Sequence, residues 1–461
     1  MNRTGRIFAL ASAVIAFGAC DFTSFETYRT HAPIISFLAP DSLPSNRYGG
    51  LIAVASDALQ NDWLVVSDGL GTPVSIQPIR VGDAIAPHTP VADIFCAGAS
   101  DCGGGGALRY GIGLGGNDAW GDGTLCAMTG SYGGIHSVHV RCLGPSTPRE
   151  SIISPPGGLE MAGFGLAIGT PRRHRRSDPA ERDLAFIGAP AGGGHLVLST
   201  PATSVDITPA LINVSAIGSA IAVGRFIAGD GTHELLLVAG STSGQVLVMH
   251  GDPRAGRAMQ PLGCLLQTEP GFGLAVATAD LDGDGSDEIA VGAGSENAGR
   301  MDVVHVYSTA NAPGGTTCDT TWAERFPIRC TNATDRDVTC EGFSSGFGSS
   351  IAGGDVDADG RDELFIGAQN AAVHSVTRAG AVFVYKGTGA GSSLSITRAA
   401  VLRDQEPQAD YLLGHEVRVA LIGTREEPLV AVPGQPAVRM FACTGLDGDR
   451  PMANGLSEEC R

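Results

Sequence analysis

Two segments of this chain match one another in register, and each places an acidic turn between two apolar runs. Residues 272–294 read FGLAVATADLDGDGSDEIAVGAG, and residues 347–369 read FGSSIAGGDVDADGRDELFIGAQ. Both begin with Phe-Gly, and both have a turn rich in aspartate and glycine before the second apolar run. A repeated strand–turn–strand unit requires a fold in which one small unit packs against further copies of itself.

Weaker copies of the same unit occur elsewhere in the chain. FGLAIGT at Phe164 leads to FIGAP at Phe186, and IGSAIAVGRF at Ile217 leads to ELLLVAG at Glu234. Neighbouring copies begin 53 to 75 residues apart, and the seven starts are Tyr48, Tyr110, Phe164, Ile217, Phe272, Phe347 and Leu413.

A period above 50 residues suits one four-stranded blade with its loops. Third strands are predicted at residues 195–198, 245–248, 302–307 and 381–385. Glycine is frequent, with 66 residues, and no long segment has the apolar periodicity of an amphipathic helix. The chain is therefore predicted to be all-β, as a single seven-bladed β-propeller of four-stranded blades over residues 33–445. Because open sheet edges invite aggregation, residues 33–38 are expected to complete the last blade.

The Phe-Gly and Gly-Ala-Pro motifs resemble the FG-GAP repeat of integrin α-subunits, whose head is a seven-bladed β-propeller. The resemblance spans residues 48–443 and is most specific for the copies at Phe164, Phe272 and Phe347. It implies a binding, adhesion or scaffold module. It also implies a calcium loop of the form D-x-D/N-x-D-G-x-x-D between the first two strands of a blade.

Carried onto this chain, the family's loop implies two Ca²⁺ sites. The first would use the side chains of Asp280, Asp282, Asp284 and Glu288 with the carbonyl of Ser286. The second would use the side chains of Asp355, Asp357, Asp359 and Glu363 with the carbonyl of Arg361. Oxygen-only ligation suits Ca²⁺, which takes about six to eight oxygens. The family usually has Asp where this chain has the two glutamates, and the alternative interpretation is a pair of acidic turns without metal.

An EF-hand does not fit the first loop, because its twelfth position is Val291 within an apolar run instead of a bidentate glutamate. The copy at Ile217 keeps only Asp230, Gly231 and Glu234, which are too few ligands for a site. In the copy at Phe164 the loop is replaced by residues 171–183, which include the arginine cluster Arg172, Arg173, Arg175 and Arg176. This arginine-rich loop is either a contact for an acidic partner or a solvated insertion.

The N-terminus has the form of an export signal. Residues 1–19 combine basic residues with a short apolar core, and Phe17-Gly18-Ala19-Cys20 resembles a bacterial lipobox. We therefore expect lipid on Cys20, an anchoring linker over residues 20–32 and a tail over residues 446–461. Simple secretion after cleavage near Cys20 is the alternative.

Apart from Cys20, the chain has ten cysteines, an even number that favours five disulfides in an oxidising compartment. Four disulfides are predicted between cysteines that are near neighbours in the sequence, and the fifth pair follows by elimination. The pairs are Cys96 with Cys102, Cys126 with Cys142, Cys330 with Cys340, Cys443 with Cys460, and Cys264 with Cys318. Zinc is the competing explanation, but the cysteines are scattered and no C-x-x-C occurs.

The formal charge of −18 opposes binding to nucleic acid or to anionic membrane surfaces, and Lys386 is the only lysine. Two motifs look enzymatic. GFSSG at residues 342–346 lacks the strand–turn–helix context of a nucleophilic Ser344, and GIGLGG at residues 111–116 is interpreted as a turn because no helix follows it.

The leading hypothesis is a calcium-binding lipoprotein at the periplasmic or outer surface of the cell envelope. It would bind a protein or glycan ligand there and meet the membrane only through its N-terminal lipid. The alternative is a propeller hydrolase or lyase that acts on envelope glycans, with an active site assembled at the ring axis.

Overall fold

The computed structural model describes the strands of the chain and many of the loops between them. The described residues are 34–38, 51–56, 62–67, 75–81, 84–85, 112–115, 125–131, 137–143, 149–158, 161, 163–171, 184–200, 202–209, 215–293, 303–312, 318–319, 322, 324–330, 338–340, 345–404, 406–422 and 425–441. Apart from single 3₁₀ turns, regular structure in these residues is β-strand. In this part of the chain no helix is long and apolar enough to cross a membrane.

The strands form mainly antiparallel sheets, and within most sheets each strand pairs with the next along the chain. The first two sheets are β2 (Leu51–Ser56), β3 (Asp62–Ser67), β4 (Ser75–Val81) and β5 (Ala84–Ile85), and β6 (Ile112–Gly115), β7 (Leu125–Ser131), β8 (Ser137–Leu143) and β9 (Arg149–Ile153). The next two are β10 (Ala167–Gly169), β11 (Ala185–Ala189), β12 (His195–Ser199) and β13 (Ser204–Asp206), and β14 (Ile217–Ile227), β15 (His233–Ser241), β16 (Gln245–Asp252) and β17 (Arg257–Leu266). A fifth strand, β21 (Cys318–Asp319), pairs in parallel with β17.

The second half of the chain repeats this plan. Two further sheets are β18 (Ala275–Ala279), β19 (Glu288–Ala293), β20 (Val303–Tyr307) and β22 (Glu324–Arg329), and β24 (Phe347–Gly354), β25 (Glu363–Ala368), β27 (Ala381–Thr388) and β28 (Ser395–Leu402). The last combines β29 (Val417–Ile422), β30 (Arg425–Val432) and β31 (Ala437–Phe441) with β1 (Ile34–Leu38). A separate pair is β23 (Val338–Thr339) with β26 (Ala372–Val373), and the 3₁₀ turns are η1 (Pro156–Gly158), η3 (Ala191–Gly193), η4 (Pro253–Ala255), η5 (Thr309–Asn311) and η6 (Gly391–Ser393).

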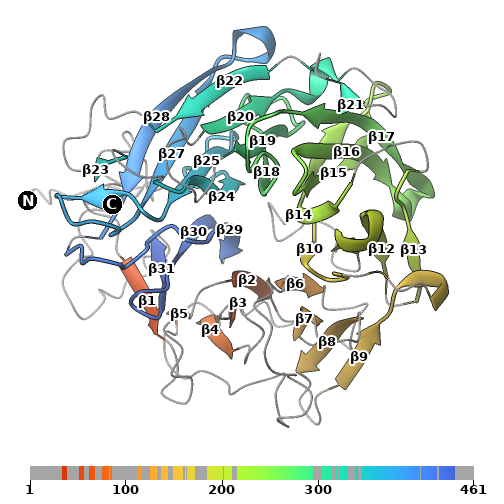
Figure 1. Cartoon of the computed structure of the whole chain (residues 1–461), viewed down its shortest axis with the longest axis horizontal. Helices are drawn as coiled ribbons and strands as arrows, with labels where there is room; N and C mark the ends of the chain where they lie inside the picture. The colour runs from red at the N-terminus through yellow and green to blue at the C-terminus, as the bar shows by residue number, and fades with distance from the viewer. Residues whose placement is uncertain are drawn as a thin grey trace, which may run out of the picture.

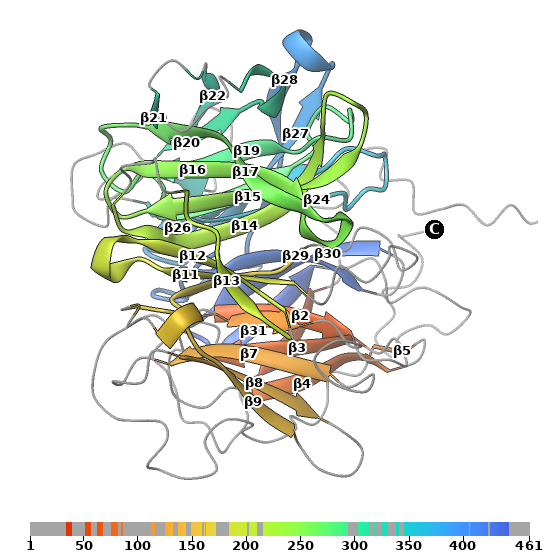
Figure 2. The ribbon, with the colours of Figure 1, turned by 90° about the vertical axis from the view of Figure 1, so that its right-hand side faces the viewer.

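The sheets are arranged as blades around a centre, with the first strand of each sheet innermost (Figure 1). These first strands contact one another in the order β2, β6, β10, β14, β18, β24 and β29, and β29 contacts β2 again. The side view shows neighbouring sheets following one another around the ring (Figure 2). The predicted all-β propeller with four-stranded blades is confirmed.

The last sheet is completed by the N-terminal segment. Strand β1 pairs antiparallel with β31, from Ile34 opposite Phe441 to Leu38 opposite Ala437. Phe37 is fully buried in a cluster with residues of the first sheet, among them Ile52. The expectation that this segment completes the last blade is confirmed for residues 34–38, and β1 thereby covers an edge that β31 would otherwise expose.

Pairs of glycines join neighbouring blades and explain the repeated Phe-Gly and Gly-Ala motifs. Gly273 has a φ of +86°, which an L side chain rarely adopts, and its carbonyl points at Gly240 of the preceding blade. A Cβ on Gly240 would stand 1.9 Å from that oxygen. Three other glycine pairs approach equally closely. A Cβ added to the first glycine would stand 2.0 to 2.2 Å from the carbonyl oxygen of the second in the pairs Gly188 and Gly218, Gly292 and Gly348, and Gly367 and Gly414. The motif is therefore a requirement of packing between blades.

One local prediction is wrong. Residues 112–115 of GIGLGG form strand β6 instead of a turn, because the first strand of this blade pairs with β7 from Ile112 opposite Thr129 to Gly115 opposite Cys126. Glycines at the centre of the ring suit strands that approach one another closely.

Several predicted features lie outside the described residues, and the predicted domain boundaries stay predictions. Those features are residues 1–19, Cys20, residues 20–32, Cys96, Cys102, Ser344, Cys443, Cys460 and residues 446–461. The arginines of the 171–183 loop also fall there.

Three of the expected cysteine pairs can be placed in the fold. Cys330 is joined to Cys340 by a disulfide. Cys264 is also disulfide-bonded, and the β17–β21 register places it opposite Cys318. The β7–β8 register places Cys126 opposite Cys142.

Candidate metal sites

The two acidic loops occupy equivalent places in neighbouring blades. The first joins β18 to β19, and the second joins β24 to β25. In each loop, the last predicted ligand is a glutamate that is also the first residue of the second strand. Glu288 pairs with Ala279, and Glu363 pairs with Gly354. The β-register therefore fixes where each glutamate stands relative to the loop that precedes it.

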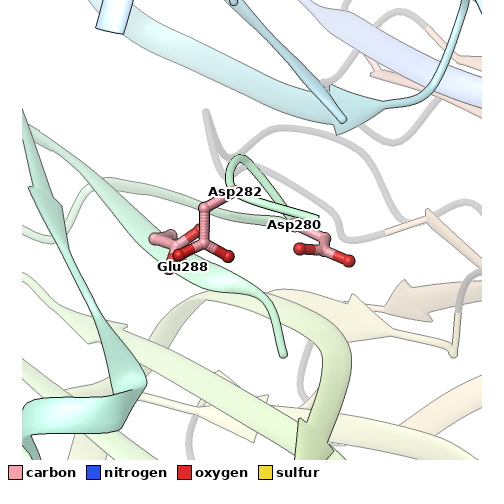
Figure 3. Close-up of side chains that lie close together, drawn as sticks. All are labelled: Asp280, Asp282 and Glu288. Carbon is pink, nitrogen blue, oxygen red and sulfur yellow. The ribbon is translucent and has the colours of Figure 1, made fainter. Parts of the chain in front are cut away.

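The first loop gathers three buried carboxylates. One oxygen each of Asp280, Asp282 and Glu288 lies within 4.8 Å of the other two, and the three side chains are shown in Figure 3. Asp284, also predicted as a ligand, is outside this group, and its Oδ1 accepts a hydrogen bond of 2.7 Å from the backbone N–H of Ser286. The Oγ of Ser286 accepts from the N–H of Ile227 in the preceding blade at 3.1 Å.

Backbone N–H groups hold these carboxylates in place. Asp280 Oδ2 accepts from Gly285 at 3.0 Å, and Glu288 Oε2 accepts from Leu281 at 3.0 Å. Asp282 Oδ2 accepts at 2.7 Å from Gly391, which belongs to the next blade. Asp280 is only 4% exposed, and its buried Oδ1 atom has no hydrogen-bond partner. A buried carboxylate oxygen without a partner is costly unless a cation fills the position.

The electrostatics of the first loop also favour a cation. Burial, together with the charge of Asp282, raises the pKa of Glu288 to about 9. Burial also raises the pKa of Asp280, although the guanidinium of Arg225, 3.5 Å from Asp280 Oδ2, opposes the shift. Bound Ca²⁺ would stabilise the ionised carboxylates and reverse these shifts. The donor set fits a hard cation, since all of its atoms are oxygens.

The second loop is built differently, because the ammonium of Lys386 lies among its carboxylates. The Nζ atom is 2.5 Å from Asp357 Oδ2, 2.6 Å from Asp359 Oδ2 and 3.7 Å from Glu363 Oε1. Asp357 and Asp359 form an acidic group with Asp355 that is more exposed than the first, and Glu363 is not part of it. Glu363 is fully buried, and its Oε2 accepts from the N–H of Val356 at 3.1 Å.

The negative charge of the second loop is partly offset inside the chain by the ammonium of Lys386. Burial raises the pKa of Glu363 to about 9 and that of Asp355 to about 6. Burial opposes protonation of Lys386, but its hydrogen bonds to Asp357 and Asp359 hold its pKa above the usual range. The side chain of Arg361, whose carbonyl is a predicted ligand, donates from Nη1 to the carbonyl of Gly389 at 2.5 Å.

The acidic residue just before Glu363, Asp362, joins neighbouring blades, and so does its counterpart Glu426 in the last sheet. Asp362 Oδ2 accepts from the N–H of Asp280 at 2.9 Å, and the N–H of Asp362 donates back to the carbonyl of Asp280 at 2.8 Å. Glu426 accepts from the N–H of Asp355 at 2.8 Å, in the same relation one blade further on. The signal was present in the sequence, since the acidic pairs Asp287-Glu288, Asp362-Glu363 and Glu426-Glu427 each stand near the start of a second strand.

The degenerate loop between β14 and β15 contains no acidic group of three among the described residues. Its glutamate, Glu234, contacts Arg257 and His250 of its own sheet. Arg257 Nη1 is 3.0 Å from Glu234 Oε1, and His250 Nδ1 is 2.5 Å from Glu234 Oε2. This loop therefore obtains its positive charge from the protein.

The strands around the ring axis carry no acidic or histidine side chains. The sequences of β2, β6, β10, β14, β18, β24 and β29 contain neither Asp, Glu nor His. A catalytic set of these groups at the axis would have to come from the loops at the two ends of the ring.

Comparison with known proteins supports the repeat assignment. The FG-GAP repeat family model matches residues 272–304 and 347–385, which contain the two acidic loops. The chain thus carries FG-GAP repeats in these two blades. No curated protein matches the sequence. Among solved structures, the chain is similar to one titled "Crystal structure of BBS1N in complex with ARL6DN, soaked with lead", with 11% identity, a TM-score of 0.47, and coverage of 90% of this chain and 97% of that chain.

Proposed function

We propose that this FG-GAP repeat chain is a calcium-stabilised β-propeller that binds another macromolecule at the bacterial cell envelope. The closed succession of first strands supports a complete ring of seven blades, each completed within the chain. Such a ring presents two faces of loops on a rigid support, and loops on a rigid support are where binding residues concentrate. The ligand would be a protein or a glycan.

The single observation that carries calcium binding is the buried, partnerless Oδ1 of Asp280 beside the carboxylates of Asp282 and Glu288. These three residues would hold Ca²⁺, which would supply the positive charge that three clustered carboxylates need. The role is structural, because Asp280 and Asp282 also bond to Asp362 and Gly391 of the next blade. Order in this loop is thereby coupled to contact between two blades.

The location rests on the N-terminal sequence. A short apolar segment that ends in Gly18-Ala19-Cys20 supports export followed by lipidation of Cys20. An even number of cysteines after Cys20, with Cys330 joined to Cys340, fits an oxidising compartment. Anchoring is tested by mass spectrometry of protein extracted from membranes. Acyl mass on Cys20 is expected, and a soluble form without acyl mass would contradict anchoring.

Calcium is expected to raise the melting temperature more than magnesium or sodium chloride of equal ionic strength. For a site that the unfolded chain does not bind, the gain is about 2.7 kcal/mol at a hundredfold excess over the dissociation constant. Asp282→Ala should abolish the calcium-specific part, because it removes one of the three clustered carboxylates.

The matched control for this experiment is Asp230→Ala, which removes a mainly exposed loop carboxylate from the degenerate copy at Ile217. It should keep the full calcium effect. The calcium assignment is wrong if the native protein responds equally to all three salts, or if Asp282→Ala responds to calcium as the native protein does.

Binding is tested by capture from envelope extracts with the whole chain, with calcium or with chelator. A specific ligand that binds in calcium and is lost with chelator is expected. Asp282→Ala, checked for its fold by circular dichroism, should capture less of the same ligand. Release of glycan fragments by the purified protein would instead favour the hydrolase or lyase alternative.

A further inference from the structure

A glutamate is the first or second residue of the second strand in three successive blades, and the charge around it differs among them. Glu288 pairs with Ala279 and Glu363 with Gly354, each as the first residue of its strand, whereas Glu234 is the second residue of β15 and pairs with Phe226. Arg257 and His250 bind Glu234, and Lys386 reaches Glu363. Among the described residues, Glu288 has no cationic partner of this kind.

The position of Lys386 is set by β-sheet register. Lys386 lies on β27 directly opposite Glu363 on β25, and its side chain is 23% exposed. In the preceding blade Tyr307 is opposite Ile289, just as Tyr385 is opposite Leu364. The residue after Tyr307 is Ser308. A neutral side chain therefore stands in the blade of the first acidic loop at the position that Lys386 has in the blade of the second acidic loop.

The ammonium of Lys386 contacts three of the four side chains predicted to bind calcium in the second loop. Two of these contacts are short, at 2.5 Å to Asp357 and 2.6 Å to Asp359. A divalent cation on the same oxygens would lie close to the fixed positive charge, and like charges at such distances repel strongly where water is partly excluded. Ammonium and calcium therefore compete for these oxygens.

We infer that Lys386 is the built-in cation of the second loop, so that this loop folds without calcium and the Asp280 loop alone requires the metal. The inference deepens the proposed function and rests on it for the first loop. It opposes the expectation of two calcium sites. The blade of Glu234 provides a precedent within the same chain, since Arg257 already supplies positive charge there.

The test is Lys386→Met, which keeps the length of the side chain and removes its charge. Calcium per chain is counted by native mass spectrometry, and melting is followed in chelator. We expect one calcium for the native protein and two for Lys386→Met. The variant should melt at a lower temperature than the native protein in chelator and regain stability in calcium.

Arg361→Met is the matched control, because it removes a positive charge from the same loop and Arg361 donates to a backbone carbonyl. It should still bind one calcium. The inference is overturned if the native protein binds two calcium ions, or if Lys386→Met leaves both the calcium count and the melting temperature in chelator unchanged. If the native protein binds none and Lys386→Met binds one, the proposed Asp280 site fails while the role of Lys386 stands.

A measurement on the unmodified protein covers the case in which the variant does not fold. Lys386 is the only lysine, so acetylation of its amine by acetic anhydride can be followed at one peptide. In the folded protein in chelator the amine should react much more slowly than in the unfolded chain, because its ammonium is held by Asp357 and Asp359. Equal rates would show that the ammonium is not held in the loop, and would overturn the inference.

Discussion

Replacing Phe37 by alanine is expected to lower the free energy of unfolding by about 3 to 5 kcal/mol, the usual cost of deleting a fully buried aromatic side chain. Phe37 lies on β1, the N-terminal strand that completes the last sheet. Its ring packs in one cluster with Ile52 and Leu64 of the first sheet and Met440 of the last. The loss would therefore weaken both the edge of the last sheet and the junction where the ring closes.

The prediction is checked by denaturant unfolding at fixed calcium, followed by circular dichroism. Leu38→Ala is the matched control, because Leu38 is the next residue on the same strand and is 61% exposed. It should change the free energy of unfolding by no more than about 0.5 kcal/mol, as is usual at exposed positions. Similar small changes for both variants would mean that β1 does not stabilise the ring.

Most of the fold could be predicted because it depends on local repeats. Alternating apolar runs identify second and third strands such as β19 and β20, and the Phe-Gly glycines mark where blades meet. Residues 111–116 were misread because a glycine-rich run is equally compatible with a turn and with a closely packed inner strand.

The candidate sites could be predicted only in part. Alternate aspartates identified both loops, because ligand spacing within a loop is local. Lys386 could not be assigned to the second loop, because it follows Glu363 by 23 residues and reaches it only through the register of β25 and β27. The bond from Asp280 to Asp362 was missed for a similar reason, since it joins loops of different blades.

Replacing Gly292 by valine is expected to lower the free energy of unfolding by about 3 kcal/mol or more, at the upper end of overpacking effects. A Cβ at this position would stand 2.2 Å from the carbonyl oxygen of Gly348 in the next blade. That oxygen belongs to the backbone and cannot rotate away. Gly348 has a φ of +84°, so its own conformation is also restricted. Strands β19 and β24 must therefore move apart.

The same movement should weaken the Asp280 loop, because Asp280 and Asp362 are hydrogen-bonded across this pair of blades. The calcium-specific rise in melting temperature is therefore expected to be smaller in Gly292→Val than in the native protein. Gly229→Val is the control, since Gly229 is exposed and an added Cβ would have no neighbour within 4 Å. A full calcium response in a destabilised Gly292→Val would show that the loop does not depend on blade contact. Unchanged stability would mean that the blades do not pack through these glycines.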